Sequence, residues 1–485
     1  MTRPGPGRNW ATGSRLWLKG WRRQSHGCGR RDMSPEAGGI GGTEWRRKAV
    51  HMGSGTLAAL LHWLPAWGAW ALGGAALLMN ILVLPSLSGH SLEREQDRRQ
   101  GVAWGIIFYP LSVLILTLVF ARRLEIAAAG WALMAFGDGM ATLVGKSLPR
   151  PRLPWNRDKS LAGTVALFFC GGGTAWLMYL FVAAGHGRHP DPFLVLAAVA
   201  ATAALAAILE SLPTGVDDNL LVPLAAGVVL YGLTLAEPAL FTARLGEWGV
   251  NLVVGLAINL VVGWLALRAR AVDGSGFAAG VVVGTFIFTF GGWRGYLMLA
   301  AFFLIGSLAT RVGYAAKAAA GIAQEKGGSR GAKNALANCG TGLFLVLLAA
   351  VTPHQTWLAV AFVAAFATAA FDTVSSEIGQ VYGRRTVLIT SLRPVPPGTE
   401  GAISLEGTVA GMAAALLLGG LGVLTGFIPP MGLGPVAAGA FVGAMGESYM
   451  GAALESIKLL DNEMVNFLNT VVGAGVALAL AVVVL

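Results

Sequence analysis

Charged residues gather at the end of an apolar stretch in "FGDGMATLVGKSLPRPRLPWNRDKSLAGT", residues 136–164. Asp138 stands there between two glycines, and an ionisable side chain in an apolar helix is costly and usually functional. Lys146, Arg157 and Lys159 follow it and would supply cations for phosphate oxygens. Two simpler interpretations stay open: Asp138 could face water at a helix end, and the basic residues could reflect membrane topology alone.

A short sequence occurs twice, as "SLAGTVA" at 160–166 and as "SLEGTVA" at 404–410. Each copy follows a polar, basic loop and begins an apolar run. The serine can cap a helix, and the glycine would let a ligand approach backbone amides at the positive end of the helix dipole. The repeated stretch predicts two phosphate-binding helix starts, formed by Ser160, Gly163, Ser404 and Gly407.

The spacing before the two copies is also shared. Asp138 precedes Gly145 by seven residues, and Asp372 precedes Gly379 by seven. Each pair leads through a Pro-containing basic loop to the repeated serine. Whether the two halves share one fold is left open by the sequence.

Oxygen ligands cluster in "ILESLPTGVDDNLLVPL", residues 208–224. Glu210, Asp217, Asp218 and Asn219 would lie beside the cations of 146–159, and hard oxygen ligands next to phosphates are typical of Mg²⁺. A turn built by the Asp and Asn side chains is the simpler alternative.

The N-terminal segment 1–43 is rich in Arg, Gly and Pro, lacks an apolar period, and is predicted to be disordered. In "EWRRKAVHMGSG", residues 44–55, Lys48 lies three residues before His51. The two side chains therefore share a helix face at the mouth of the first apolar run.

A second polar group closes an apolar run in "ATAAFDTVSSEIG", residues 367–379. Asp372 and Ser376 are four residues apart, as are Thr373 and Glu377. This spacing places carboxylates and hydroxyls on adjacent faces of one helix.

More polar residues of this half lie in 324–340, in the Pro/Gly-rich loop 393–408, and in the last two apolar runs. The loop leads into a helix and offers backbone amides for a phosphate. Near the chain end, Asn462, Asn466 and Asn469 form one polar stripe, which could equally serve interhelical hydrogen bonding. The candidate phosphate-binding residues here are Arg330, Lys333, Asn338, Arg393, Gly398, Thr399, Ser404 and Gly407.

The composition indicates a polytopic membrane protein. Of the 485 residues, 55% are hydrophobic and 12% charged, about half the charged share of a soluble domain. Apolar runs of about 17–25 residues recur from residue 49 to the end, each long enough to cross the hydrocarbon layer as a helix. The net charge of +10 lies largely in the N-terminal segment and does not indicate nucleic-acid binding.

We predict an all-α membrane protein with about fifteen spans in two tandem helical bundles, 44–240 and 248–485, joined by a polar link at 236–247. Loops rich in Lys and Arg stay on the cytoplasmic side of a membrane. We therefore expect the two loops that lead to the repeated serines to face the cytoplasm, in a prokaryotic plasma membrane. The predicted spans are 49–65, 68–87, 101–120, 124–145, 160–184, 193–212, 219–235, 248–267, 276–290, 295–310, 336–352, 355–371, 404–426, 431–456 and 464–485.

The first half resembles the CTP-dependent polyprenol kinases, in particular phytol kinase. The likeness lies in GDGMA, LPWNRDKSLAGT, DDNLLVP, RRKAVH and FYP, in the right order over 44–235. It implies transfer of the γ-phosphoryl group of CTP to the hydroxyl of a membrane isoprenoid alcohol. The positions that match the family are Asp138, Lys159, Ser160, Gly163, Asp217, Asp218 and Asn219.

The second half, 248–485, resembles the membrane family that includes phytyl-phosphate kinase. It matches in LAN, D-T-x-x-S-E-I-G, PPGT-x-G and S-L-x-G-T. It departs from the family at two places. This chain has Glu447-Ser448 where the family has Asp-Ser, and it has Arg393 where the family frequently has Lys. The resemblance implies phosphorylation of the isoprenyl monophosphate.

We therefore expect a bifunctional membrane kinase that binds CTP, a divalent cation such as Mg²⁺, an isoprenoid alcohol and its monophosphate. An alcohol needs a base, for which Asp138 or Asp218 is the candidate, whereas a monophosphate is already anionic and needs cations. A cytidylyltransferase and a secondary transporter are the alternatives, the latter disfavoured because the polar residues are predicted at helix ends. Catalytic roles are predicted for Asp138, Asp218, Asp372 and Glu377, metal binding for Asp138, Asp217, Asp372 and Glu447, and supporting roles for Lys48, His51, Glu210, Asn466 and Asn469.

Overall fold

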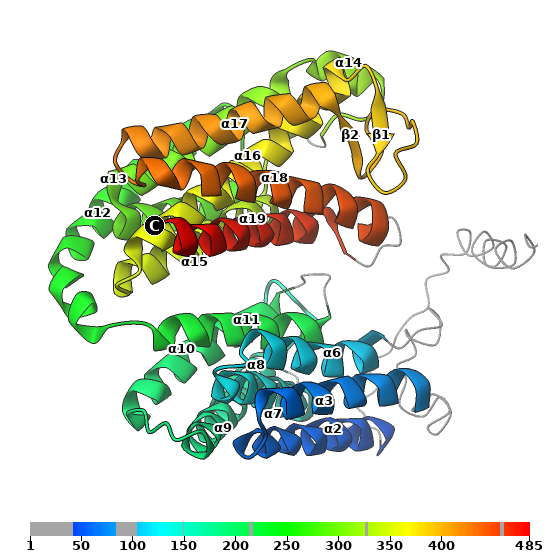
Figure 1. Cartoon of the computed structure of the whole chain (residues 1–485), viewed down its shortest axis with the longest axis vertical. Coiled ribbons are helices and arrows are strands. Elements are labelled where there is room, and N and C mark those ends of the chain that lie inside the picture. Colours follow the sequence, from blue (N-terminus) through cyan, green and yellow to red (C-terminus); the bar gives the residue numbers. More distant parts are fainter. Residues whose placement is uncertain (1–41, 84–103, 149, 213–216, 325–327, 456–459) are drawn as a thin grey trace, which may run out of the picture. The chain divides into compact units, whose positions relative to one another are not determined.

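The computed structural model describes residues 42–83, 104–148, 150–212, 217–324, 328–455 and 460–485 (Figure 1). Nearly all of the segment predicted to be disordered, 1–43, lies outside these residues. The described chain is helical apart from one short hairpin, as expected for a backbone that must satisfy its hydrogen bonds within lipid.

Within its described residues, the first half contains eight α-helices interrupted by short 3₁₀ and π segments. Asp191 caps α10 and is followed by proline at the first helical position, a common helix start. The elements are α2 (Gly42–Gly55), η1 (Thr56–His62), α3 (Ala66–Leu78), η2 (Met79–Val83), α6 (Trp104–Val119), α7 (Leu124–Ser147), α8 (Leu161–Ala166), η3 (Leu167–Gly171), α9 (Gly172–Gly185), α10 (Pro192–Ser211) and α11 (Asp218–Thr234).

The second half contains the antiparallel hairpin, in which Thr386 pairs with Ser404. Its second strand lies within the Pro/Gly-rich loop at 393–408. The elements are α12 (Pro238–Arg268), α13 (Gly274–Arg311), α14 (Tyr314–Ala319), α15 (Ala332–Val351), α16 (Gln355–Tyr382), β1 (Thr386–Leu388), β2 (Ala402–Ser404), α17 (Leu405–Leu424), η5 (Pro430–Gly432), α18 (Leu433–Met450), η6 (Gly451–Glu455) and α19 (Asn462–Val484).

The prediction of an all-α polytopic membrane protein is confirmed. Within the described residues, 10 helices are long and apolar enough to cross a membrane, and two shorter apolar helices accompany them. The predicted spans 276–290 and 295–310 are two helical segments of the element α13, separated as predicted by a non-helical residue, Gly292, with φ 61° and ψ −168°. The polar link predicted at 236–247 is wrong, because α12 begins at Pro238 and runs through it.

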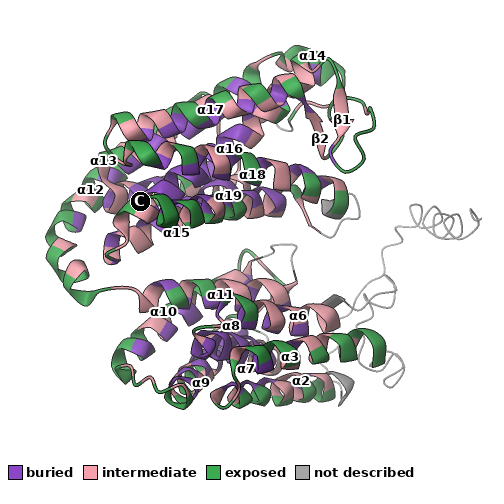
Figure 2. Ribbon diagram, viewed as in Figure 1, coloured by how far each residue is buried: buried purple, intermediate pink, exposed green. Residues whose placement is uncertain are grey.

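Two helices, α7 and α16, form the centres of two clusters of buried side chains. One cluster lies among residues 58–230 and the other among 283–481. In Figure 2 both central helices are mostly purple, the colour of buried residues. Long alanine runs, such as Ala127–Ala129, let neighbouring helices approach these two closely. The domain boundary between the halves stays a prediction.

Candidate active sites

Asp138 lies inside α7, well before its end at Ser147, rather than at the predicted helix end. The Lys48 ammonium of α2 lies 2.5 Å from the Asp138 carboxylate and is only 2% exposed. His51, one turn further along α2, places its Nε2 atom 3.5 Å from the same carboxylate. The predicted shared face of Lys48 and His51 is therefore turned toward Asp138.

His51 is enclosed between the Lys48–Asp138 ion pair and an aromatic ring. Its ring centre lies 4.5 Å from that of Tyr109, whose hydroxyl accepts hydrogen bonds from Ser54 at 3.0 Å and Trp131 at 2.8 Å. Burial lowers the pKa of His51 to about 4, against the opposing effect of Asp138. The imidazole is therefore neutral at pH 7, and Lys48 is the cation that faces Asp138.

Lys159 reaches from the loop before α8 to two carboxylates on different helices. Its ammonium forms an ion pair with Glu210 at the end of α10 and lies 3.1 Å from Asp218 at the start of α11. Burial opposes the charged form of Lys159, but the Asp218 and Glu210 carboxylates outweigh it and raise the pKa of the ammonium. Asp138 interacts electrostatically with both Lys159 and Asp218, so the structure brings together the first group of predicted residues.

The repeated serines act as helix caps. Ser160 Oγ accepts a hydrogen bond from the Gly163 amide at 3.1 Å, and Ser404 Oγ accepts one from the Gly407 amide at 3.2 Å. Asp217 has the same kind of role, because it caps α11 and accepts two hydrogen bonds from Asn219. These cap contacts use groups that were predicted to bind phosphate or metal, and the ligand roles stay predictions.

The remaining basic residues predicted for the first half lie at the surface. Lys146 is exposed at the end of α7, and Arg157 is exposed in the loop that follows. The Arg157 carbonyl accepts a 2.6 Å hydrogen bond from the Arg152 guanidinium, which stabilises the loop.

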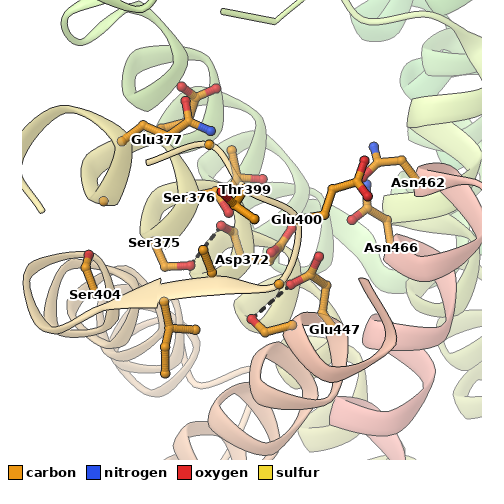
Figure 3. Close-up of a pocket in the computed structure, with 18 of the residues that line it drawn as sticks. Asp372, Ser375, Ser376, Glu377, Thr399, Glu400, Ser404, Glu447, Asn462 and Asn466 are labelled. Carbon is orange, nitrogen blue, oxygen red and sulfur yellow. Dashed lines mark hydrogen bonds between the residues drawn. The ribbon is translucent and has the colours of Figure 1, made fainter. Parts of the chain in front are cut away.

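The second half contains a cavity of about 310 Å³. Asp372 on α16 and Glu447 on α18 line it, and their carboxyl groups lie close enough to share a hydrogen bond. Figure 3 shows both side chains directed toward the space beside β2. Like Asp138, Asp372 lies inside its helix and not at the predicted end at residue 371, because α16 continues to Tyr382. The predicted position at a helix end is therefore wrong for Asp138 and Asp372 but correct for Asp217 and Asp218, at the start of α11.

Glu377 and Arg330 add charge to the wall of this cavity. Glu377 is 3% exposed, forms an ion pair with Lys317 through Oε2, and has no partner for Oε1 among the described residues. Burial lowers the pKa of the Arg330 guanidinium, which lies over the Phe302 ring, 5.7 Å from its centre. No carboxylate within the described ranges forms an ion pair with Arg330.

Amide and hydroxyl groups complete the cavity. Asn338 and Asn466, both buried, line it from α15 and α19, and Asn462 lies one turn before Asn466 (Figure 3). The loop before β2 contributes Gly398, with φ 84°, and Thr399. The cavity thus joins most of the residues predicted for this half.

Four predicted residues of this half lie outside the cavity wall, among them Gly407, which is buried in the first turn of α17. Lys333 and Arg393 are both exposed, and Asn469 is buried deeper along α19. The Asn469 side-chain oxygen has no hydrogen-bond partner in the part of the chain that the structure describes.

The two sites could bind a metal ion only if a bound ligand supplied some of the coordinating atoms. Among the described residues, no group of three or more His, Cys, Asp or Glu side chains could hold a metal ion. Magnesium commonly binds through one or two carboxylates together with substrate phosphates and water. The Asp372 and Glu447 pair fits that chemistry, whereas Asp217 is engaged in a helix cap.

Several residues at these sites were not predicted from the sequence. Lys317, Tyr109 and Glu400 contact or line the two sites. Tyr109 and Glu400 lie in the FYP and PPGT-x-G motifs but were given no role there, and Lys317 lies in no motif. Burial of Lys317 beside Glu377 depends on residues 60 positions apart, which local spacing does not reveal. A lysine inside an alanine-rich segment is the one signal that marks Lys317.

These observations define the class of the protein, which is a polytopic helical membrane protein with polar sites at its central helices. The chain belongs to a family of that class, the integral membrane protein family DUF92, whose profile matches residues 257–474. An uncharacterized membrane protein of Synechocystis sp. is 44% identical over 208 residues, which cover 42% of this chain and 81% of the relative. Protein VTE6, chloroplastic, of Arabidopsis thaliana is 36% identical over 232 residues, covering 46% of this chain and 70% of that protein.

The chain is also similar to phytol kinases. Phytol kinase 1, chloroplastic, of Arabidopsis thaliana is 31% identical over 206 residues, which cover 38% of this chain and 65% of the kinase. The chain thus spans less than two thirds of the length of that kinase. No solved structure matches the chain.

Proposed function

We propose that this protein is a membrane isoprenoid kinase that phosphorylates an isoprenoid alcohol with CTP and then phosphorylates the resulting monophosphate. The observation that carries the proposal is the juxtaposition of Asp138, Lys159 and Asp218 in a segment that resembles polyprenol kinases. The similarity to phytol kinases supports the first step, and the cavity of the second half supports a second phosphate site.

In the first step, the hydroxyl oxygen of the alcohol attacks the γ-phosphorus of CTP, the bond to the β-phosphate oxygen breaks, and CDP leaves. The hydroxyl proton passes to a carboxylate. Asp218 has a side chain 32% exposed, against 18% for Asp138, so it is the more accessible base. Lys159 and Lys48 keep the surrounding carboxylates charged and in place.

In the second step, an oxygen of the monophosphate attacks the γ-phosphorus, and CDP leaves again. Two anions must approach, so the site needs positive charge more than a base. Arg330 is the basic side chain that lines the cavity, and Asn338 and Asn466 can donate hydrogen bonds to phosphate oxygens. A bound Mg²⁺ would supply charge neutralisation at the donor phosphates, held by Asp372 and Glu447.

The test uses purified protein with Mg²⁺, geranylgeraniol or phytol, and CTP labelled at either the γ- or the α-phosphate. Label from the γ-phosphate should enter a lipid monophosphate and then a diphosphate. Asp138→Asn should fail on the alcohol but convert added monophosphate, and Asp372→Asn should stop at the monophosphate. Label from the α-phosphate in lipid would instead show a cytidylyltransferase, and no lipid label would contradict the kinase.

A further inference from the structure

The two halves are built as repeats of one four-helix arrangement. In the first, α7 packs against α8, α9 and α11, and α10 packs against α11. In the second, α16 packs against α17 and α19, and α18 packs against α19. The order along the chain is the same, with α7 corresponding to α16, α8–α9 to α17, α10 to α18 and α11 to α19 (Figure 1).

The two halves also share one register before the capping serines. Arg152 and Ser160 form an antiparallel bridge, and Thr386 and Ser404 form the corresponding one. The first residue of each bridge stands fourteen positions after the aspartate of its central helix. The loops that lead to the two serines therefore correspond to each other and can be compared.

Each of these loops joins two membrane spans. The first basic loop (150–159) follows α7, and the second basic loop (383–403) follows α16 and contains β1 and β2, which lie at the ends of α16 and α17 (Figure 1). The helical segments on both sides of each loop are long and apolar enough to cross a membrane. A connection between successive spans begins where the hydrocarbon layer ends, so both loops start at the level of the lipid headgroups.

The first basic loop holds an indole ring at this level. Trp155 is 58% exposed, although its Nε1 atom donates a 3.2 Å hydrogen bond to Ser211 Oγ at the end of α10. The next residue, Asn156, donates a 3.1 Å hydrogen bond to the Ser211 carbonyl. These contacts fix the loop to the helix end and leave much of the ring uncovered, as is typical of tryptophan at a membrane surface.

The second basic loop holds a leucine in a strained backbone conformation. Leu392 has φ 53°, which a bulky residue rarely adopts, and its side chain is 71% exposed. Its N–H donates a 2.7 Å hydrogen bond to the Leu388 carbonyl, and the Leu388 N–H donates one of 2.9 Å to the Arg393 carbonyl. The closed turn thus stabilises a strained residue whose side chain packs against little of the protein, and strain of this kind is typical of functional positions.

Exposed arginines accompany both apolar side chains. They are Arg150 and Arg157 in the first loop and Arg384, Arg385 and Arg393 in the second. Within the described ranges of the chain, none of them forms an ion pair. The two loops contain one carboxylate each, Asp158 and Glu400, and Glu400 lines the cavity. An exposed apolar side chain among unpaired cations is typical of segments that bind the surface of a membrane.

We propose that both basic loops dock on anionic phospholipid headgroups, with Trp155 and Leu392 inserted between the headgroups and the arginines bound to their phosphates. A guanidinium group suits a phosphate in geometry and charge. Zwitterionic headgroups offset their phosphate with an ammonium, so an excess of arginine selects lipids of net negative charge. This surface does not depend on the phosphoryl transfer proposed above, and it would hold both central helices at a fixed depth in the bilayer.

The first experiment measures the depth of each loop in proteoliposomes of phosphatidylcholine and phosphatidylglycerol. A nitrobenzoxadiazole label is attached through Leu392→Cys or Trp155→Cys, in the full-length protein with its three native cysteines replaced by alanine. We expect strong quenching by lipids brominated near the headgroup and weak quenching by iodide in the water. Strong quenching by iodide with none by brominated lipid would overturn the proposal.

The second experiment keeps the native cysteines and measures binding of short-chain phosphatidylglycerol by calorimetry, in neutral detergent. We expect two sites in the parent protein. Glutamine at Arg384, Arg385 and Arg393 should remove one of them, and glutamine at Arg150 and Arg157 the other, whereas lysine at the same positions should retain both. Thermal unfolding checks that each variant is folded.

The matched control is Arg244→Gln, which should bind as the parent does. Arg244 Nη2 lies 3.3 Å from Gln355 Oε1, at the end of α16 opposite to the second basic loop. Unchanged binding in the folded glutamine variants, or equal binding of short-chain phosphatidylcholine, would refute selection of anionic headgroups. Equal binding of inorganic phosphate would assign the arginines to a free anion and would also overturn the proposal.

Discussion

The ammonium of Lys48 donates a 2.5 Å hydrogen bond to the carboxylate of Asp138 and thereby joins α2 to α7. Lys48 is 2% exposed, so its charge has little contact with water and depends on Asp138. Removal of Lys48 leaves the Asp138 carboxylate, whose side chain is 18% exposed, without its ammonium partner.

Replacement of Lys48 by methionine should therefore destabilise the first half by about 3 kcal/mol, since breaking a buried ion pair leaves an uncompensated charge. Thermal unfolding in detergent would show this as a lower Tm, with Lys48→Arg as the control that keeps the charge. If Lys48→Met melted at the same temperature as the parent, the pair would be structurally unimportant.

Lys159 should matter for chemistry more than for folding, because its side chain is 29% exposed and connects carboxylates of two helices. Lys159→Met should lower the rate of alcohol phosphorylation by about 100-fold, the usual effect of removing a positioned charge near a phosphoryl group. Conversion of added monophosphate serves as the internal control and should persist. Equal loss of both activities would indicate a folding defect instead.

The protein should lose stability as the pH falls from about 6.5 to about 4. The pKa of His51 is lowered by burial from 6.5 to about 4, so in this window the unfolded chain binds a proton that the folded protein does not. The effect can reach about 3 kcal/mol. Melting temperatures of the parent and of His51→Asn across this range would test it, because the neutral variant should show a weaker dependence on pH.

The packing beside the two site aspartates is reversed between the halves, since Gly137 lies against Leu167, whereas Phe371 lies against Gly411. This exchange predicts a double-mutant result. Gly411→Leu should be strongly destabilising, because a side chain there meets the Phe371 ring and carbonyl. Adding Phe371→Gly reproduces the arrangement of the first half and should recover part of the loss. Unfolding measured for the two single variants and the double variant gives the coupling, and additive effects would refute the correspondence.

The sequence predicts the long apolar helices well, because length and hydropathy alone define them. The predicted span 193–212 corresponds to α10, Pro192–Ser211, and 124–145 to α7, Leu124–Ser147. Prediction fails where polar residues continue a helix. Arg244 and Glu247 interrupt the apolar pattern, but α12 runs through them.

The sequence also identifies only part of each site, because only relations between residues close in the chain can be read from it. Local spacing places Lys48 and His51 on one face and finds Ser160 and Ser404, because these relations span few residues. It does not reveal that Lys317 meets Glu377, or that Arg393 stays outside the cavity, because those facts depend on how distant helices pack.

The exchanged pairs Gly137–Leu167 and Phe371–Gly411 also bear on how the chain folds correctly. A repeated architecture invites mispairing, in which the central helix of one half accepts the partner helix of the other. Here the two wrong combinations would bring Phe371 against Leu167, which overfills the interface, and Gly137 against Gly411, which leaves a void. The same feature that reveals the repeat therefore discriminates against assembly of hybrid bundles.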